Sequence, residues 1–249
     1  MSDSALVGPY APVLPPGEDE LPSSDGEPMD SERHCKQMNL LVDSLASFWH
    51  FRDDFYAGGN MFLYFNELQA KKNTFRGPDV FVVLDTIRRE RKSWVMWQKE
   101  RAPDVIIELL SPSTEHVDRG EKMRIYGRVL RVPEYYLYEP GADTLEGYQP
   151  NHQLAYAPLA PDKRGQFLSQ RLGIRLGVWT EGLYQGIPGP WLRWWDDTGH
   201  VLPSDEEAAR SAQADARSAQ AEAQTAQDQA AALQEKLAAY EKRFGPLLR

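Results

Sequence analysis

The segment 76–118 constrains the fold more than any other part of the chain. Two short apolar runs in it, 80–84 and 105–110, are rich in β-branched residues and bounded by Pro, Gly and Ser, which is typical of buried strands. Asp79 precedes the first run and Glu108 lies inside the second. Two carboxylates on neighbouring strands, with a lysine just beyond, indicate a hydrolytic metal site, because Mg²⁺ takes one or two carboxylates together with water and phosphate oxygens.

Each of these side chains also has a plainer interpretation. Asp79 follows a proline, and Pro-Asp is common in turns. Glu108 needs a partner, since an ionised carboxylate inside an apolar strand is costly unless it is paired or metal-bound, and a structural ion pair is the alternative. Lys122 is either a surface lysine or a charge that steadies a phosphate. Asp104, in a second Pro-Asp, competes with Asp79, but it would lie roughly 13 Å along the strand from Glu108, too far to share one metal.

The hydrophobic pattern predicts an α/β domain over residues 32–203. Apolar residues recur every three or four positions over 32–48, which predicts a helix capped by Ser31. The pair Asp118 and Glu121 resembles a capping box and predicts a second helix, from 119 to 129. Four runs are expected as strands of one mixed sheet, with a further short strand at 93–97: 61–65, 80–84, 105–110 and 135–138.

Turn-forming residues indicate the connections. The Gly-Gly-Asn sequence within 55–60 predicts a turn, and residues 66–78 predict a loop. Residues 143–178 alternate short apolar pieces with turns, which predicts antiparallel strands that extend the sheet. The last substantial strand is expected over 172–179, and the tryptophan-rich residues 185–203 predict a loop-rich flap.

The two ends of the chain differ from its middle. Residues 1–31 combine Pro, Ser and seven acids with no Lys or Arg, which is typical of a disordered or loosely docked arm. Residues 204–243 lack Gly and Pro, and their Ala, Leu and Tyr residues follow the three-and-four spacing of a coiled coil. Because Ala buries little surface, pairing would rest on Leu233, Leu237 and Tyr240. A solitary helix, or one packed on its own domain, is the alternative.

Charge is distributed unevenly along the sequence. The net charge of -9 is concentrated in the two ends, whereas residues 71–131 hold fourteen Lys and Arg against nine Asp and Glu. That local excess would help to hold a phosphate backbone, although ordinary solvated surface gives the same count. The single cysteine, Cys35, excludes an intramolecular disulfide. No apolar run approaches the ~20 residues of a membrane span and no signal-peptide pattern is visible, so the expected location is the cytoplasm.

Four motifs resemble the Uma2 family of restriction-endonuclease-like proteins, which have the PD-(D/E)xK nuclease fold and are abundant in cyanobacteria and some other bacteria. The resemblance covers about residues 30–180. The motifs are Arg-Gly-Pro-Asp at 76–79, Ile-Glu-Leu-Leu-Ser-Pro-Ser-Thr at 107–114, Asp-Arg-Gly-Glu-Lys at 118–122 followed by Tyr126, and Val-Pro-Glu-Tyr-Tyr at 132–136.

The resemblance implies a restriction-endonuclease-like mixed sheet flanked by helices, in which Asp79 and Glu108 bind Mg²⁺ or Mn²⁺. The superfamily often adds an acid from the first helix, for which Glu32 is the candidate, with His34 as a polar neighbour. The lysine that the superfamily carries two residues after the second acid is replaced, and the resemblance assigns its role to Lys122.

Two functions from different classes follow. The first is a Mg²⁺-dependent endonuclease that hydrolyses phosphodiester bonds of DNA and acts as a homodimer, since cutting both strands commonly needs two active sites. The second is a catalytically weak or inactive nuclease fold that binds or assembles through its coiled coil, in which case the tail binds another protein. The set Asp79, Glu108 and Lys122 favours the first, while the acidic arm and the long tail support the second.

Overall fold

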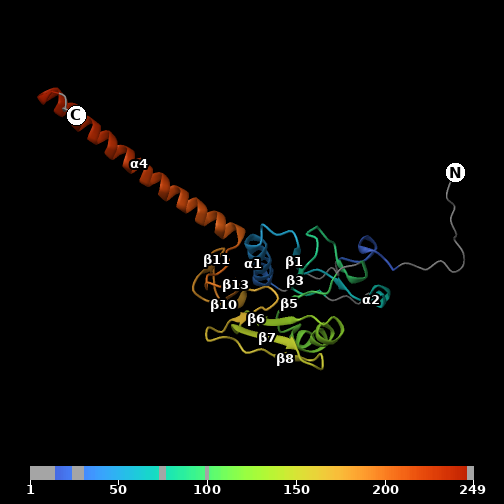
Figure 1. Ribbon diagram of the computed structural model, residues 1–249. Helices are drawn as coiled ribbons and strands as arrows, with labels where there is room; N and C mark the ends of the chain where they lie inside the picture. The colour runs from blue at the N-terminus through green and yellow to red at the C-terminus, as the bar shows by residue number, and fades with distance from the viewer. Residues whose placement is uncertain (1–14, 24–30, 73–76, 99–100, 246–249) are drawn as a thin grey trace, which may run out of the picture. The chain divides into compact units, whose positions relative to one another are not determined.

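The computed structural model describes residues 15–23, 31–72, 77–98 and 101–245, and its main sheet is six-stranded and mixed (Figure 1). Its third and fourth strands in spatial order run parallel, and the other neighbours in this sheet are antiparallel. The strands in spatial order are β1 (Phe55–Gly59), β3 (Val80–Leu84), β5 (Val105–Leu109), β6 (Glu134–Glu139), β7 (Thr144–Pro150) and β8 (Tyr156–Pro158). The predicted strands at 80–84, 105–110 and 135–138 are therefore neighbours, and the mixed α/β fold class is confirmed.

Both faces of the sheet are buried because its strands alternate between two apolar cores. On β5, Val105, Ile107 and Leu109 face one core. Ile106 and Leu110 face the other. Helix α1 (Glu32–Phe48) covers the first face beside β1 and β3, as Figure 1 shows, and it begins where predicted, with Ser31 accepting a hydrogen bond from the His34 amide.

The second face is covered by a helical segment that begins one turn earlier than predicted. It consists of α3 (Glu115–Val117) and two π-helical stretches, η3 (Asp118–Lys122) and η4 (Ile125–Val129). Asp118 therefore lies inside the segment, with an αR backbone, and does not cap its start. The capping-box interpretation was wrong because the same Asp-x-x-Glu spacing also occurs within a helix.

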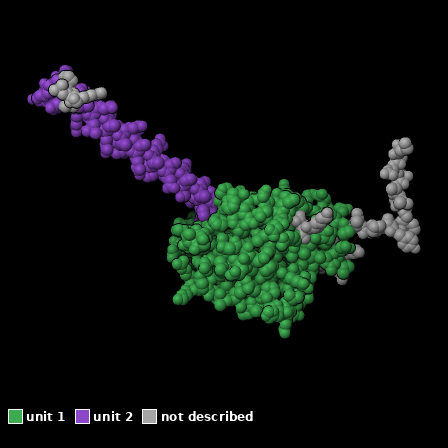
Figure 2. Space-filling view, viewed as in Figure 1, with its two compact units in different colours: residues 1–202 green, residues 203–249 purple. Residues whose placement is uncertain are grey.

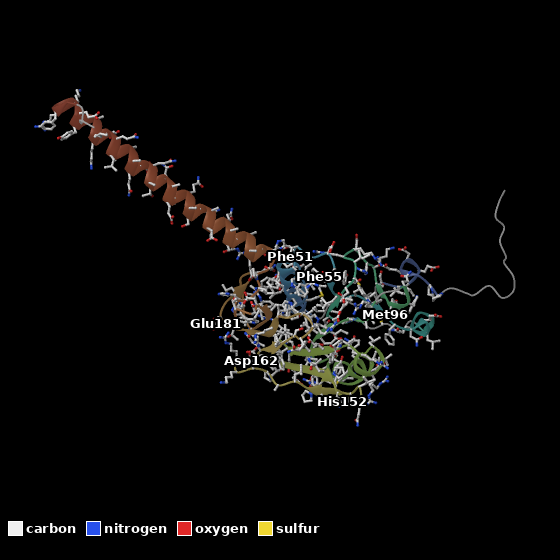
Figure 3. All side chains as sticks on the ribbon, viewed as in Figure 1. Phe51, Phe55, Met96, His152, Asp162 and Glu181 are labelled. Atoms are coloured by element: carbon white, nitrogen blue, oxygen red, sulfur yellow. The ribbon has the colours of Figure 1, made fainter. Side chains whose placement is uncertain are left out.

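The strand at 55–59 replaces the predicted turn. Gly59 is needed there for close packing, since a Cβ at this position would lie 2.5 Å from the Asp79 carbonyl oxygen and 2.5 Å from the Met38 side chain. The turn falls at Asn60, whose φ of 47° is in the left-handed region. Phe55 of this strand, labelled in Figure 3, packs edge-on against Trp49, and the ring centroids of the two residues are 5.0 Å apart.

The predicted strand at 61–65 lies outside the main sheet. Its observed part, β2 (Leu63–Tyr64), pairs in parallel with β4 (Trp94–Val95), which is the short strand expected near 93–97. A short helix, α2 (Glu67–Lys72), stands where a loop was predicted. A turn of 3₁₀ helix, η2 (Met96–Gln98), follows β4.

A separate three-stranded sheet forms where the sequence predicted an extension of the first sheet and a flap. It contains β9 (Phe167–Leu168), β10 (Arg175–Trp179) and β13 (Trp191–Trp195). Between β10 and β13 in the sequence, β11 (Leu183–Tyr184) and β12 (Ile187–Pro188) form a two-stranded sheet of their own. Trp191 and Trp194 are fully buried. The tryptophans thus belong to a core strand, and of the predicted extension only β7 and β8 join the main sheet.

Residues 15–23 of the predicted acidic arm contact the domain. They include a turn of 3₁₀ helix, η1 (Glu18–Glu20), and Leu21, which is buried against Phe62, Tyr64 and Val95. The remainder of the arm, 1–14 and 24–30, lies outside the described residues.

The chain divides into two compact units, residues 1–202 and 203–249, near the predicted boundary at 203 (Figure 2). The second unit is one continuous helix, α4 (Asp205–Phe244), which confirms the predicted long C-terminal helix. Ser204 and Glu207 form the capping box at its start. Within the described ranges, neither α4 nor a shorter helix has the sustained apolar stretch needed to cross a membrane.

Candidate active site

The pairing register of β3 and β5 brings the two predicted acids together. Val80 pairs with Ile107, so the next pair along the antiparallel ladder is Asp79 and Glu108, on one face of the sheet. Each carboxylate accepts a hydrogen bond from a backbone amide on the side of the other acid. The Asp79 amide donates to Glu108 Oε2 at 3.2 Å, and the Leu109 amide donates to Asp79 Oδ2 at 2.7 Å.

Lys122 reaches the same point from the helical segment. Its Nζ lies 3.0 Å from Glu108 Oε2 and 2.8 Å from Asp118 Oδ1, and it donates to the Gly77 carbonyl at 3.4 Å. Glu108 is fully buried and Lys122 is only 15% exposed. The three side chains predicted from the sequence thus form one cluster, whereas the competing Asp104 is held elsewhere by Arg171.

Of the two candidates on the first helix, His34 reaches the cluster. Its Nε2 lies 3.0 Å from Asp79 Oδ1, and its position in the first turn of α1 is fixed by the Ser31 cap. Glu32 is 78% exposed and pairs with Lys36 at 3.5 Å. The sequence ranked His34 below Glu32, but it is the His34 ring that reaches Asp79 from the turn that the cap fixes.

Two further residues of the site were not predicted. Asp118, 1% exposed, contacts Lys122, and its carbonyl accepts a hydrogen bond of 2.9 Å from the buried Tyr135 hydroxyl. Tyr126 is fully buried, and burial together with the neighbouring Glu108 raises the pKa of its hydroxyl well above the usual value. The signal in the sequence was the four-residue spacing of Asp118, Lys122 and Tyr126, which places all three on one side of a helix.

Burial and mutual charge set the ionisation of the carboxylates. Burial raises the pKa of Glu108 well above its usual range, and Asp79 and Asp118 add to this effect, which Lys122 only partly opposes. Burial likewise raises the pKa of Asp118 despite Lys122. For Asp79, burial is outweighed by the hydrogen bond and charge of His34 and by Lys122, so its pKa is lowered.

The ionisation of Lys122 follows from the same charges. Burial acts against its positive charge, but Glu108, Asp118 and Asp79 outweigh burial and raise its pKa. Lys122 therefore contacts two carboxylates, Glu108 and Asp118, while Asp79 contacts His34, so three carboxylates share the charge of one lysine and one histidine. Such a site favours a further cation.

Comparison with known proteins places the chain in a family. The Uma2 model, described as "Putative restriction endonuclease", matches residues 23–184. The chain belongs to the Uma2 family. The match confirms the resemblance carried by the sequence motifs, and it includes every residue of the cluster.

Two individual proteins are similar to this Uma2 chain. An uncharacterized protein of Synechocystis is 26% identical over 110 residues, which are 44% of this chain and 54% of the relative, so the chain spans about half the length of that relative. The crystal structure of a "putative nuclease belonging to DUF820" from Anabaena variabilis superposes with a TM-score of 0.44 at 17% identity, covering 64% of this chain and 92% of that one.

The residues of this Uma2 site fit a hard divalent cation. Among the described residues, no group of three or more His, Cys, Asp or Glu side chains is placed to hold a metal. Mg²⁺ needs only one or two carboxylates, since it keeps several waters and takes phosphate oxygens. The Glu108 carboxylate is buried beside the Tyr126 hydroxyl, whose pKa it helps to raise, and Asp79 faces it from the neighbouring strand, so two carboxylates are at hand for such an ion.

A cavity of about 250 Å³ adjoins the site, next to His34. It lies where β5 and β6 end, so the same ends of the strands carry both the cluster and the cavity. Its lining residues are Ser31, Arg33, His34, Leu110, Ser111, Pro112, Pro140 and Gly141.

Part of the local basic excess is engaged within the protein. Arg91 is buried and stacks on Trp94 at 4.5 Å. Arg89 pairs with Glu18 at 3.1 Å, and Lys92 pairs with Asp19 at 2.6 Å, so the N-terminal segment neutralises this loop. The predicted electrostatic attraction of a phosphate backbone is thus weaker at this loop than the residue count indicated.

Proposed function

We propose that this Uma2 protein is a Mg²⁺- or Mn²⁺-dependent endonuclease that hydrolyses phosphodiester bonds of DNA. The observation that carries the proposal is the buried cluster of Asp79, Glu108 and Lys122. A structural ion pair needs two charges, whereas here two acids and one lysine lie together beside a cavity, with Asp118 and His34 in contact with them. Membership of the Uma2 family, whose model is described as "Putative restriction endonuclease", supports the same reaction class.

Each side chain has a distinct role in the proposed reaction. Asp79 and Glu108 would hold the cation, which when bound polarises the phosphate and lowers the pKa of a water. Lys122 would place its ammonium against a phosphate oxygen and stabilise the negative charge that develops during attack by water. His34 would orient Asp79 through its 3.0 Å contact.

Supercoiled plasmid incubated with the protein and Mg²⁺ or Mn²⁺ tests the proposal. We expect nicked or linear product that EDTA abolishes, and we expect Asp79→Asn and Glu108→Gln to remove cleavage and to weaken Mn²⁺ binding measured by calorimetry. Glu32→Gln, on the exposed acid of the same helix as His34, is the matched control. Undiminished cleavage in Asp79→Asn or Glu108→Gln would refute the assignment.

A second function is supported by a specific feature of α4. It has no buried residue, and it exposes a row of large apolar side chains at its C-terminal end. A nuclease fold without cleavage that assembles through this helix would give no plasmid product with either metal, while the full chain would still associate.

A further inference from the structure

The Lys122 ammonium lies against the Glu108 carboxylate, where a divalent cation bound to Glu108 would also lie. Its Nζ lies 3.0 Å from Glu108 Oε2, the oxygen that also accepts the Asp79 amide. A divalent cation held by Asp79 and Glu108 would stand close to this ammonium. Like charges a few ångströms apart in a buried site repel strongly. A side chain other than Glu108 must then hold the Lys122 ammonium in the active site, where the proposed reaction places it against a phosphate oxygen.

Asp118 is placed to do this. Its Oδ1 lies 2.8 Å from Lys122 Nζ. The two backbone hydrogen bonds that tie Asp79 and Glu108 to each other's strands do not involve Asp118. It is therefore the acid that remains available to the ammonium when the other two hold a cation.

The position of Asp118 is itself fixed. The residue is 1% exposed and lies in the π-helical stretch η3, one turn before Lys122. The hydroxyl of Tyr135, a residue of β6, donates a buried hydrogen bond of 2.9 Å to the Asp118 carbonyl oxygen. A π-helical stretch and a buried anchor of this kind often mark functional sites, because they hold a side chain where a regular helix would not.

We propose that Asp118 is a positioning residue that retains the Lys122 ammonium at the active site when a cation binds to Asp79 and Glu108. The inference rests on the proposed function. It extends that function by explaining how a lysine on a helix can replace one on the strand. Asp118 acts through Lys122 and does not itself contact the cation.

Kinetics test the link between the two residues. Asp118→Asn keeps the shape and removes the charge, so plasmid cleavage should fall by about tenfold to a hundredfold, while Mn²⁺ affinity changes little. In the Lys122→Met background the same substitution should change nothing further, because its effect passes through Lys122. An equal loss in both backgrounds, or a loss of Mn²⁺ affinity like that of Asp79→Asn, would overturn the proposal, and the second result would make Asp118 a ligand.

A labelling experiment separates this proposal from the proposed function. Acetylation of Lys122 by acetic anhydride, followed by peptide mass spectrometry, needs no cleavage. We expect Lys122 of the full chain to stay protected when Mn²⁺ is added, and to be labelled several-fold faster with Mn²⁺ in Asp118→Asn. If that variant does not fold, Asp118→Glu, which moves the carboxylate by one methylene, is used instead, and faster labelling of Lys122 with Mn²⁺ is again expected.

The outcomes of the labelling are distinct. Equal protection in the variant and the parent with Mn²⁺ would refute the role of Asp118, whatever the cleavage assay gives. Protection that depends on Asp118, in a protein that cuts no DNA, would instead refute the nuclease and leave the positioning contact in place.

Discussion

At the residue scale, the burial of Glu108 has a measurable consequence for stability. Its pKa is raised well above the usual value, mainly by burial, so the folded state favours the protonated form. The stability from this group is complete below the unfolded pKa of about 4.3 and is lost as the pH rises through the folded pKa. Glu108→Gln lacks this loss. In metal-free buffer we expect the variant to gain stability relative to the parent between pH 4.5 and pH 8, by about 1.4 kcal/mol per unit of pKa elevation.

Urea unfolding at the two pH values measures this difference. Glu32→Gln, which removes a charge from an exposed carboxylate, is the control for a general effect of net charge. A Glu108→Gln advantage that is the same at both pH values, or larger at pH 4.5, would contradict the elevated pKa.

The acids of the site could be predicted from the sequence, but their surroundings could not. Asp79 and Glu108 were predicted from their positions at two successive strands and from the family motifs, whereas the register that places them on one face is known from the structure. Asp118 was interpreted as a cap because its spacing to Glu121 fits one, and only the earlier start of the helix shows that it is buried. His34 was secondary to Glu32 because a sequence does not reveal how a helix is rotated about its axis.

At the scale of elements, the N-terminal segment acts as part of the core. Leu21 is 8% exposed and packs with Phe62, Tyr64 and Val95. The Trp97 indole also donates to the Pro16 carbonyl at 2.9 Å. We expect Leu21→Ala to lower the free energy of unfolding by about 2 kcal/mol, the lower end of the range for buried leucines, because the site lies near the surface.

Chemical denaturation measures the effect of Leu21→Ala. Leu68→Ala is the matched control, since Leu68 is 53% exposed and should change the stability little. Equal denaturation midpoints for Leu21→Ala and the parent would show that residues 15–23 are only loosely docked, which is one of the two states that the composition of the arm predicted.

The errors at this scale have a common physical cause. Local propensity identified the buried strands β3, β5 and β6, whose sequences are apolar on both faces. It failed for β1, because Gly58 and Gly59 serve close packing but were interpreted as a turn. It also failed for β13, because its tryptophan-rich sequence was interpreted as a loop-rich flap. Which strands share a sheet depends on partners far away in sequence, so no local pattern separated the second sheet from the first.

At the scale of the whole molecule, the exposed apolar side chains of α4 lead to a prediction about assembly. Its 40 residues span about 60 Å. Leu233, Leu237, Tyr240 and Phe244 follow the four-three-four spacing of a coiled-coil seam, and they are between 46% and 66% exposed. The alanines before them permit close approach and bury little, so the C-terminal end should supply most of the pairing energy.

We propose that these residues pair with those of a second copy, because closed twofold symmetry is the commonest assembly and would supply the second active site for a double-strand cut. Sedimentation of the full chain should give a dimer whose population rises with concentration, and a chain that ends at Pro203 should be a monomer. Replacing Leu233, Leu237 and Tyr240 by Ala keeps the helix, given the high helix propensity of Ala, and should also give a monomer. A dimer that persists without the helix would assign assembly to the first unit. A monomer at every concentration would make the exposed seam a docking surface for a different protein, and it would remove the model of a nuclease that cuts both strands as a pair.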